Sequence, residues 1–80
     1  MTTRKAIAEL RVLEAELAEM MEWSARLERE PDPTTQRQYD RRAESYFENA
    51  LRFARATGAR DFEIEHLAMR EALTVSEHSN

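Results

Sequence analysis

Apolar residues recur at alternating steps of three and four positions over the first third of the chain. The series runs through Thr3, Ala6, Leu10, Leu13, Leu17, Met20, Ser24 and Leu27, with Ile7 and Met21 beside it. Residues at this spacing lie along one stripe of an α-helix, and such a stripe needs another helix to cover it. We therefore predict a helix over residues 3–29 that packs lengthwise on a second helix, with Thr2 or Thr3 as its N-terminal cap.

The same alternating spacing of three and four residues recurs in the middle of the chain. This second series contains Tyr39, Ala43, Tyr46, Ala50, Phe53 and Thr57. The Glu-Pro-Asp-Pro segment at residues 30–33 separates the two series, since each proline disfavours the α conformation in the residue before it. Asp32 suits an N-cap and Pro33 suits the first helical position. We predict a second helix over residues 33–57, antiparallel to the first because the connection is short.

The only glycine, Gly58, follows the last periodic residue and fits a left-handed helix end. Asp61 then suits the N-cap of a third helix over residues 61–75. This helix carries two apolar stripes, one formed by Phe62, His66, Met69 and Leu73 and the other by Ile64, Ala68, Ala72 and Val75. A helix that is apolar on two sides needs two neighbours. We expect it to pack both on the hairpin and on a partner chain.

The fold expected from these elements is all-α. The chain has 80 residues, no cysteine and two histidines, so neither a disulfide nor a structural zinc site is expected. Domains of this size bury little of their surface and often depend on a second subunit. We predict one helical domain, an antiparallel hairpin with a shorter third helix, which forms a homodimer and thereby a bundle of four to six helices.

The charge distribution narrows the possible partners. The net charge of −4 argues against a general binder of phosphate backbones, which carries a basic excess. No apolar run approaches the roughly 20 residues of a membrane span. Residues 1–5 lead into a glutamate-rich helix and not into an apolar signal core. We expect a cytoplasmic protein that does not interact with membranes.

A local basic row on the second predicted helix suggests one alternative, a nucleic-acid-associated regulator. Its members are Arg37, Arg41, Arg42, Arg52 and Arg55, and they interleave with Tyr39, Tyr46, Phe47 and Phe53. Base stacking requires aromatic and basic side chains on one exposed platform. Here the aromatic residues fall on the apolar stripe and the arginines mostly opposite it. We therefore favour a solvated face of mixed charge and place the four aromatic residues in the core.

The third predicted helix carries a second alternative. Glu63 and His66 form a Glu-x-x-His motif, and residues 63–69 resemble the metal helix of ferritin-like di-iron proteins, including the short two-helix type that assembles its site across a dimer. The resemblance implies a di-metal carboxylate site with Glu63 and His66 from both subunits, completed by Glu16 or Glu19. The competing interpretation, which we favour, makes His66 a partly buried packing residue and assigns no metal or cofactor.

A second resemblance favours protein–protein interaction. Residues 43–54, followed by Gly58, look like the second helix and turn of a tetratricopeptide repeat, and residues 61–73 look like the start of the next repeat. Members of this family bind peptides or proteins on stacked helices. The match covers about one repeat, and the first predicted helix lacks the Trp-Leu-Gly-Tyr pattern of the family.

No residue pattern predicts catalysis. Ser24 and Ser45 are far in sequence from either histidine, and a single glycine cannot make a phosphate-binding loop. We expect a small acidic adaptor, inhibitor or regulator that binds another protein and masks its surface. Trp23 and the adjacent methionines suit such a contact. The predicted partner-binding residues are Glu16, Glu19, Met20, Met21, Glu22, Trp23 and Leu27.

Overall fold

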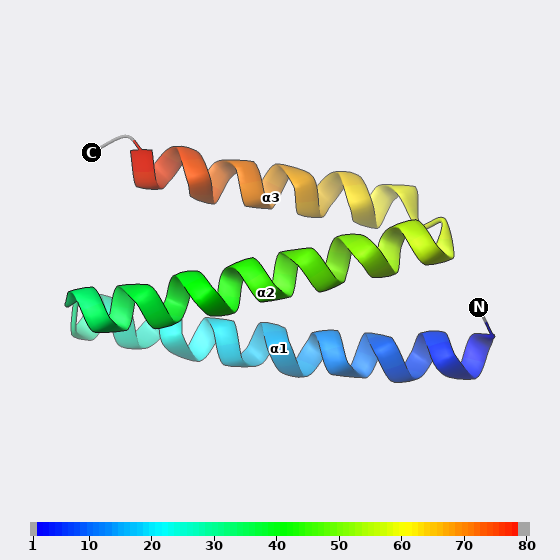
Figure 1. Cartoon of the computed structure of the whole chain (residues 1–80), viewed down its shortest axis with the longest axis horizontal. Helices are drawn as coiled ribbons and strands as arrows, with labels where there is room; N and C mark the ends of the chain where they lie inside the picture. The colour runs from blue at the N-terminus through cyan, green and yellow to red at the C-terminus, as the bar shows by residue number, and fades with distance from the viewer. Residues whose placement is uncertain (1, 79–80) are drawn as a thin grey trace.

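The computed structural model describes the backbone of residues 2–78 and the side chains of residues 2–73, and this part of the chain is all-helical. Helix α1 spans Thr3–Arg29, α2 spans Pro33–Thr57 and α3 spans Arg60–His78 (Figure 1). The first two helices begin and end where the periodicity predicts. The third begins one residue earlier and ends three residues later than predicted. The expected side-chain position of Val75 lies outside the described residues.

Local hydrogen bonds explain where α1 and α2 begin. The hydroxyl of Thr2 accepts from the backbone N–H of Lys5 at 3.3 Å, so Thr2 is the cap of α1. Asp32 caps α2 more completely, because its carboxylate accepts from both the N–H and the hydroxyl of Thr35, at 2.9 and 3.0 Å. These bonds, first of all the backbone one, hold the pKa of Asp32 below its ordinary value.

The turn between α2 and α3 depends on Gly58. Its φ of 73° lies in the left-handed region, and the N–H of Ala59 donates to the carbonyl of Ala54 at 3.0 Å, which closes the end of α2. The prediction that Asp61 caps α3 is wrong. Helix α3 already begins at Arg60, and the carbonyl of Ala59 accepts from the N–H of Glu63 at 3.0 Å. Asp61 instead lies in the first turn, where its negative charge favours the positive end of the helix dipole.

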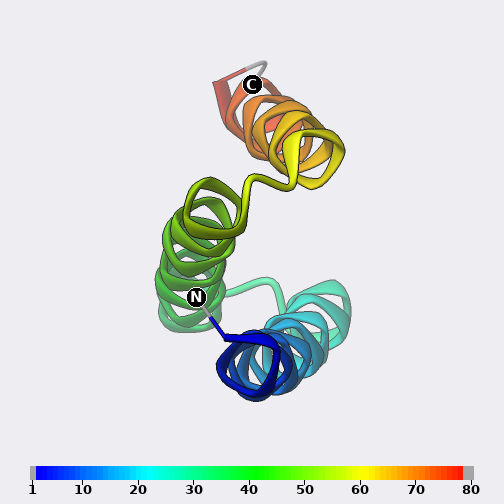
Figure 2. The same ribbon diagram turned by 90° about the vertical axis from the view of Figure 1, so that its right-hand side faces the viewer.

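The three helices form an open row with α2 in the middle. Helices α1 and α2 form the predicted antiparallel hairpin, and α3 folds back along the other side of α2 (Figure 1). Within the described residues α1 and α3 do not contact each other. The end-on view shows the row bending at α2 (Figure 2). Each outer helix therefore has one neighbour, and any closed bundle requires another chain.

The core lies along α2. Leu13 and Met20 of α1 pack on residues of α2 that share one face, namely Ala43, Tyr46, Phe47 and Ala50. Tyr39, Phe53, Leu17, Phe62 and Leu73 pack around this cluster and are half-buried. The prediction that the aromatic residues of α2 belong to the core is confirmed.

Several large apolar side chains remain uncovered on the two outer helices. On α1 they are Ile7, Leu10, Val12 and Met21, and on α3 they are Ile64 and Met69. Ala68 and Ala72, on the same predicted stripe as Ile64, are also exposed. Both outer helices thus carry apolar surface that the other described residues leave exposed.

Candidate partner-binding groove

Two parallel rows of side chains run along α2 on the side toward α3. One row is apolar and contains Ala43, Phe47 and Leu51. The adjacent row is acidic and contains Asp40, Glu44 and Glu48. Both rows arise from a spacing of four residues, which places side chains one above the other on a helix. An apolar strip is therefore bordered by carboxylates over about two helical turns.

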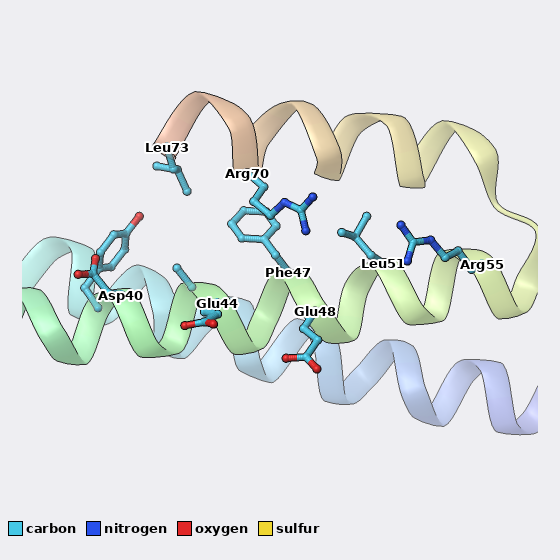
Figure 3. A pocket seen from close by; sticks show the side chains of 10 residues that line it. Asp40, Glu44, Phe47, Glu48, Leu51, Arg55, Arg70 and Leu73 are labelled. Atoms are coloured by element: carbon cyan, nitrogen blue, oxygen red, sulfur yellow. The ribbon is translucent and has the colours of Figure 1, made fainter. Parts of the chain in front are cut away.

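Helix α3 turns these rows into a groove. Arg70 and Leu73 of α3 close its far side, and Tyr39 and Arg55 of α2 form its two ends. The groove has a volume of about 510 Å³. Figure 3 shows Phe47 and Leu51 pointing from α2 toward α3, with the three carboxylates along the opposite edge. The groove exists because α3 is closest to α2 near the Gly58 turn and diverges from it toward the other end (Figure 1).

The acidic edge is incompletely neutralised within the chain. Asp40 accepts a hydrogen bond from the amide of Gln36 at 2.8 Å, which leaves its charge unbalanced. Glu48 pairs with Arg52 at 3.4 Å, but both side chains are well exposed, so the pair stabilises little. Glu44 has no ion-pair partner among the described residues. The edge therefore presents negative charge to any molecule that enters the groove.

The opposite end of the groove is basic. The guanidinium of Arg55 is held by Glu63 of α3, with Nε 2.9 Å from Oε2. This pair joins α2 to α3 near the turn. Arg70 lies farther along α3 and points into the space between the helices (Figure 3). The groove is thus apolar along its floor and acidic along the α2 edge, and Arg55 and Arg70 are its two basic lining residues.

A buried polar pair holds α3 on α2 beneath the groove. The ring of His66 is 7% exposed, and its Nδ1 lies 2.8 Å from the carbonyl oxygen of Phe62. A carbonyl can only accept, so Nδ1 carries the hydrogen, and Nε2 of the neutral ring accepts from the hydroxyl of Tyr46 at 2.9 Å. Both ring nitrogens are thereby satisfied. This pair fixes the position of α3 and with it the far wall of the groove.

Aromatic packing and charge surround this pair. The ring of Phe62 stacks on His66 with centroids 4.0 Å apart, and Phe47 meets Tyr46 edge to face at 5.3 Å. Burial raises the pKa of Tyr46, and the negative charge of Glu16 on α1 raises it further. The phenol is consequently held in its neutral form, the form that donates to His66.

The geometry around Glu63 and His66 bears on the di-metal alternative. Glu63 points to Arg55, and His66 uses both nitrogens within the protein. Glu16 accepts from the amide of Asn49, and Glu19 pairs with Arg42 at 2.7 Å. Within the described part of the chain, no three potential ligands gather in a group that could hold a metal ion. Within one chain, Glu16 and Glu19 lie on a helix that does not contact α3, and all four side chains have partners inside the chain. A site assembled across two chains stays a prediction.

The predicted partner-binding residues of α1 fall into two groups. Met20 lies in the core, Leu27 is half-buried, and Glu16 and Glu19 bind α2 as described. Met21 and Glu22 are exposed. Trp23 is half-buried beneath Arg26, whose guanidinium carbon is 4.7 Å from the ring centroid, and lines a small hollow with Glu19, Glu22 and Arg29. Of the predicted set, Glu19, Met21 and Glu22 are therefore exposed, and Glu19 is already paired with Arg42.

The arginine row of α2 is largely engaged in ion pairs. Arg42, Arg52 and Arg55 pair with glutamates on α1, α2 and α3 respectively. Tyr46 and Phe47 are buried, so they do not share an exposed platform with the arginines. This arrangement matches a solvated face of mixed charge more closely than a surface for base stacking.

Sequence reasoning missed the groove itself. The four-residue spacing of Asp40, Glu44 and Glu48 is visible in the sequence, but spacing alone does not show that these carboxylates border a groove. Periodicity does not show which side of α2 meets α3, and so it could not bring Arg70 and Leu73 opposite these carboxylates.

Comparison with protein-family models, with curated proteins and with solved structures finds no match to this chain. Among the described residues, no helix combines the length and apolar character needed to cross a membrane.

Proposed function

We propose that this chain is a non-catalytic protein-interaction module that binds a helical segment of another protein and masks it. The groove between α2 and α3 carries this proposal, because it combines an apolar floor with an acidic edge. Grooves of this kind accept the apolar face of an amphipathic helix, whose anchors recur at three- and four-residue spacing. Masking such a segment would make the chain an adaptor, an inhibitor or another regulator.

The charges of the groove specify the chemistry of the bound segment. Asp40, Glu44 and Glu48 favour lysine or arginine along one side of the incoming helix and disfavour glutamate there. The expected ligand is a basic amphipathic helix with two or three apolar anchors. These anchors pack against Tyr39 and Leu73, the half-buried apolar residues of the groove, above the buried Phe47 and Leu51.

The open arrangement of the helices supports this function. Each outer helix contacts only α2, so apolar surface is left on both ends of the row. A partner that covers such surface gains the free energy of burying it. We include a homodimer in the proposal for the same reason. A cytoplasmic location is also part of the proposal, because a chain without cysteine needs no oxidising compartment.

Two synthetic helical peptides test the groove directly. Both carry the same leucine anchors, and they differ only in having arginine or glutamate at the flanking positions. In an NMR titration of the isotope-labelled chain, the arginine peptide should shift the backbone signals of residues 39–55 and 70–73, and the glutamate peptide should not. A Glu65→Lys variant provides the control, because Glu65 is exposed on α3 but does not line the groove. Equal shifts with both peptides, or none with either, would contradict the proposal.

A further inference from the structure

The outward face of α1 carries an apolar stripe that none of the described residues covers. Ile7, Leu10, Ala18 and Met21 lie along it, with Glu14 at its centre. These positions are three, four or seven residues apart and so share one side of the helix. Ile7 is 49% exposed and Met21 is 61% exposed. Figure 2 shows α1 at one end of the row, with α2 on one side only.

Charge is distributed unevenly along the same helix. The first turns carry a basic excess, with Arg4, Lys5 and Arg11 against Glu9, whereas the middle is acidic. The acidic part contains Glu14, Glu16, Glu19 and Glu22, and no basic residue lies between Arg11 and Arg26. Glu16 and Glu19 bind α2, which leaves Glu14 and Glu22 for a contact with another chain. A helix with this distribution is complementary to a second copy of itself that runs in the opposite direction, since the basic turns of one then face the acidic turns of the other.

We infer that a second copy of this chain covers this stripe, with the two α1 helices antiparallel about a two-fold axis near Glu14. Ile7 of one protomer then meets the partner's Met21, and Leu10 meets the partner's Ala18. The two-fold axis repeats each contact, which is the usual form of a homodimer interface. The paired Glu14 side chains at the axis are flanked by Arg11 of both protomers, which balances their charge.

Arg4 and Glu22 make this arrangement specific. Both are exposed and lie on the same flank of the stripe, about five full turns apart on α1. In the antiparallel pair, the two-fold axis brings Arg4 of each protomer opposite the partner's Glu22. The same two residues are separated by roughly 27 Å within one rigid helix, so they cannot pair inside a single chain. If the effects of substituting Arg4 and Glu22 on dimerisation depend on each other, the two side chains therefore meet between two chains.

This inference deepens the homodimer included in the proposed function and uses a surface separate from the groove. Its test is the mass of the chain in solution, by light scattering over a concentration series that reaches the millimolar range. The wild-type chain should dimerise. Arg4→Glu alone and Glu22→Arg alone should each raise the dimer dissociation constant about tenfold or more, because like charges then face each other twice. The Arg4→Glu/Glu22→Arg double variant should restore the dimer.

Matched control variants show whether an effect on dimerisation is specific to the α1 interface. Arg37→Glu and Glu65→Arg make the same charge changes at exposed sites on α2 and α3 and should leave the dimer intact. Met21→Ser should weaken it, whereas Val12→Ser should not, since Val12 is also exposed but lies on another side of α1. A wild-type chain that stays monomeric, single charge reversals without effect, or a double variant that remains monomeric would each overturn the inference.

The experiments can contradict the α1 interface without contradicting the groove, and the reverse. A monomeric wild-type chain that still binds the arginine peptide contradicts the α1 interface and leaves the groove supported. A dimer that responds to the charge reversals as expected, yet binds neither peptide, supports the α1 interface and contradicts the groove as a binding site.

Discussion

At the scale of single residues, the Tyr46–His66 pair matters most, because it joins α2 to α3 inside the core. The hydroxyl of Tyr46 donates to His66, and the His66 ring in turn donates to the carbonyl of Phe62. No buried side-chain polar atom among the described residues lacks a hydrogen-bond partner. Removing one member of such a network leaves the other unsatisfied, which costs more than the bond itself contributes.

The first prediction follows from this network. Tyr46→Phe should lower the free energy of unfolding by about 1–2 kcal/mol, because Nε2 of His66 loses its donor while remaining buried. Pairing Tyr46→Phe with His66→Leu should cost less than the sum of the two single changes. Urea denaturation of the four proteins measures this coupling. Additive losses would show that the pair does not act as a unit.

The second prediction concerns alkaline pH and also belongs to Tyr46. Its pKa is raised in the folded chain, so the unfolded chain loses the phenol proton first as the pH increases. The stability contributed by the neutral phenol is therefore complete below the ordinary pKa of 10.0 and falls as the pH rises through the raised value. Urea midpoints measured on either side of this pH should show the fall in the wild-type chain and a smaller fall in Tyr46→Phe. Parallel curves for the two proteins would contradict the assignment.

At the scale of the elements, the ends of the helices depend on a few specific residues. Gly58 adopts a left-handed conformation with open space around its Cα, so an added Cβ would meet no neighbour. The cost of replacing it is then conformational and not steric crowding with other residues. A change in stability after replacement of Gly58 therefore reports on the backbone conformation of the turn and not on side-chain packing.

The third prediction tests this turn. Gly58→Ala should destabilise the chain by roughly 1–2 kcal/mol, since a residue with a Cβ is disfavoured at a φ of 73°. Gly58→Asn should cost less, because asparagine tolerates this region better. Thermal unfolding of the three proteins provides the comparison. Equal stability of the alanine variant and the wild-type chain would show that the end of α2 does not need the left-handed residue.

Much of the element structure could be predicted from the sequence, and the reasons lie in particular residues. The Pro-Asp-Pro segment separates α1 from α2, and Gly58 ends α2. The bounds of both helices could therefore be predicted. The start of α3 could not be predicted, because Asp61 is equally suited to a cap or to a first turn. The groove could not be predicted either, since it depends on the position of α3, which is determined by contacts such as Tyr46 with His66 that are distant in sequence.

At the scale of the whole molecule, α2 is the only helix that contacts two others among the described residues, so the free energy of local opening should be highest there. Regions with more buried contacts open less often. The fourth prediction is that amide hydrogens of residues 43–54 exchange most slowly, while the first turns of α1 and the part of α3 beyond His66 exchange faster. Hydrogen exchange measured by NMR checks this order. Uniform protection along all three helices would contradict an open row of helices.

The measurement that tests the central claim most directly is the affinity of the groove for the two matched peptides, before and after its acidic edge is reversed. The wild-type chain should prefer the arginine peptide. Reversal of two edge carboxylates, as Glu44→Lys/Glu48→Lys, should weaken binding of that peptide about tenfold, equivalent to ~1.4 kcal/mol, and strengthen binding of the glutamate peptide. If the reversal leaves both affinities unchanged, the groove between α2 and α3 is not the binding site.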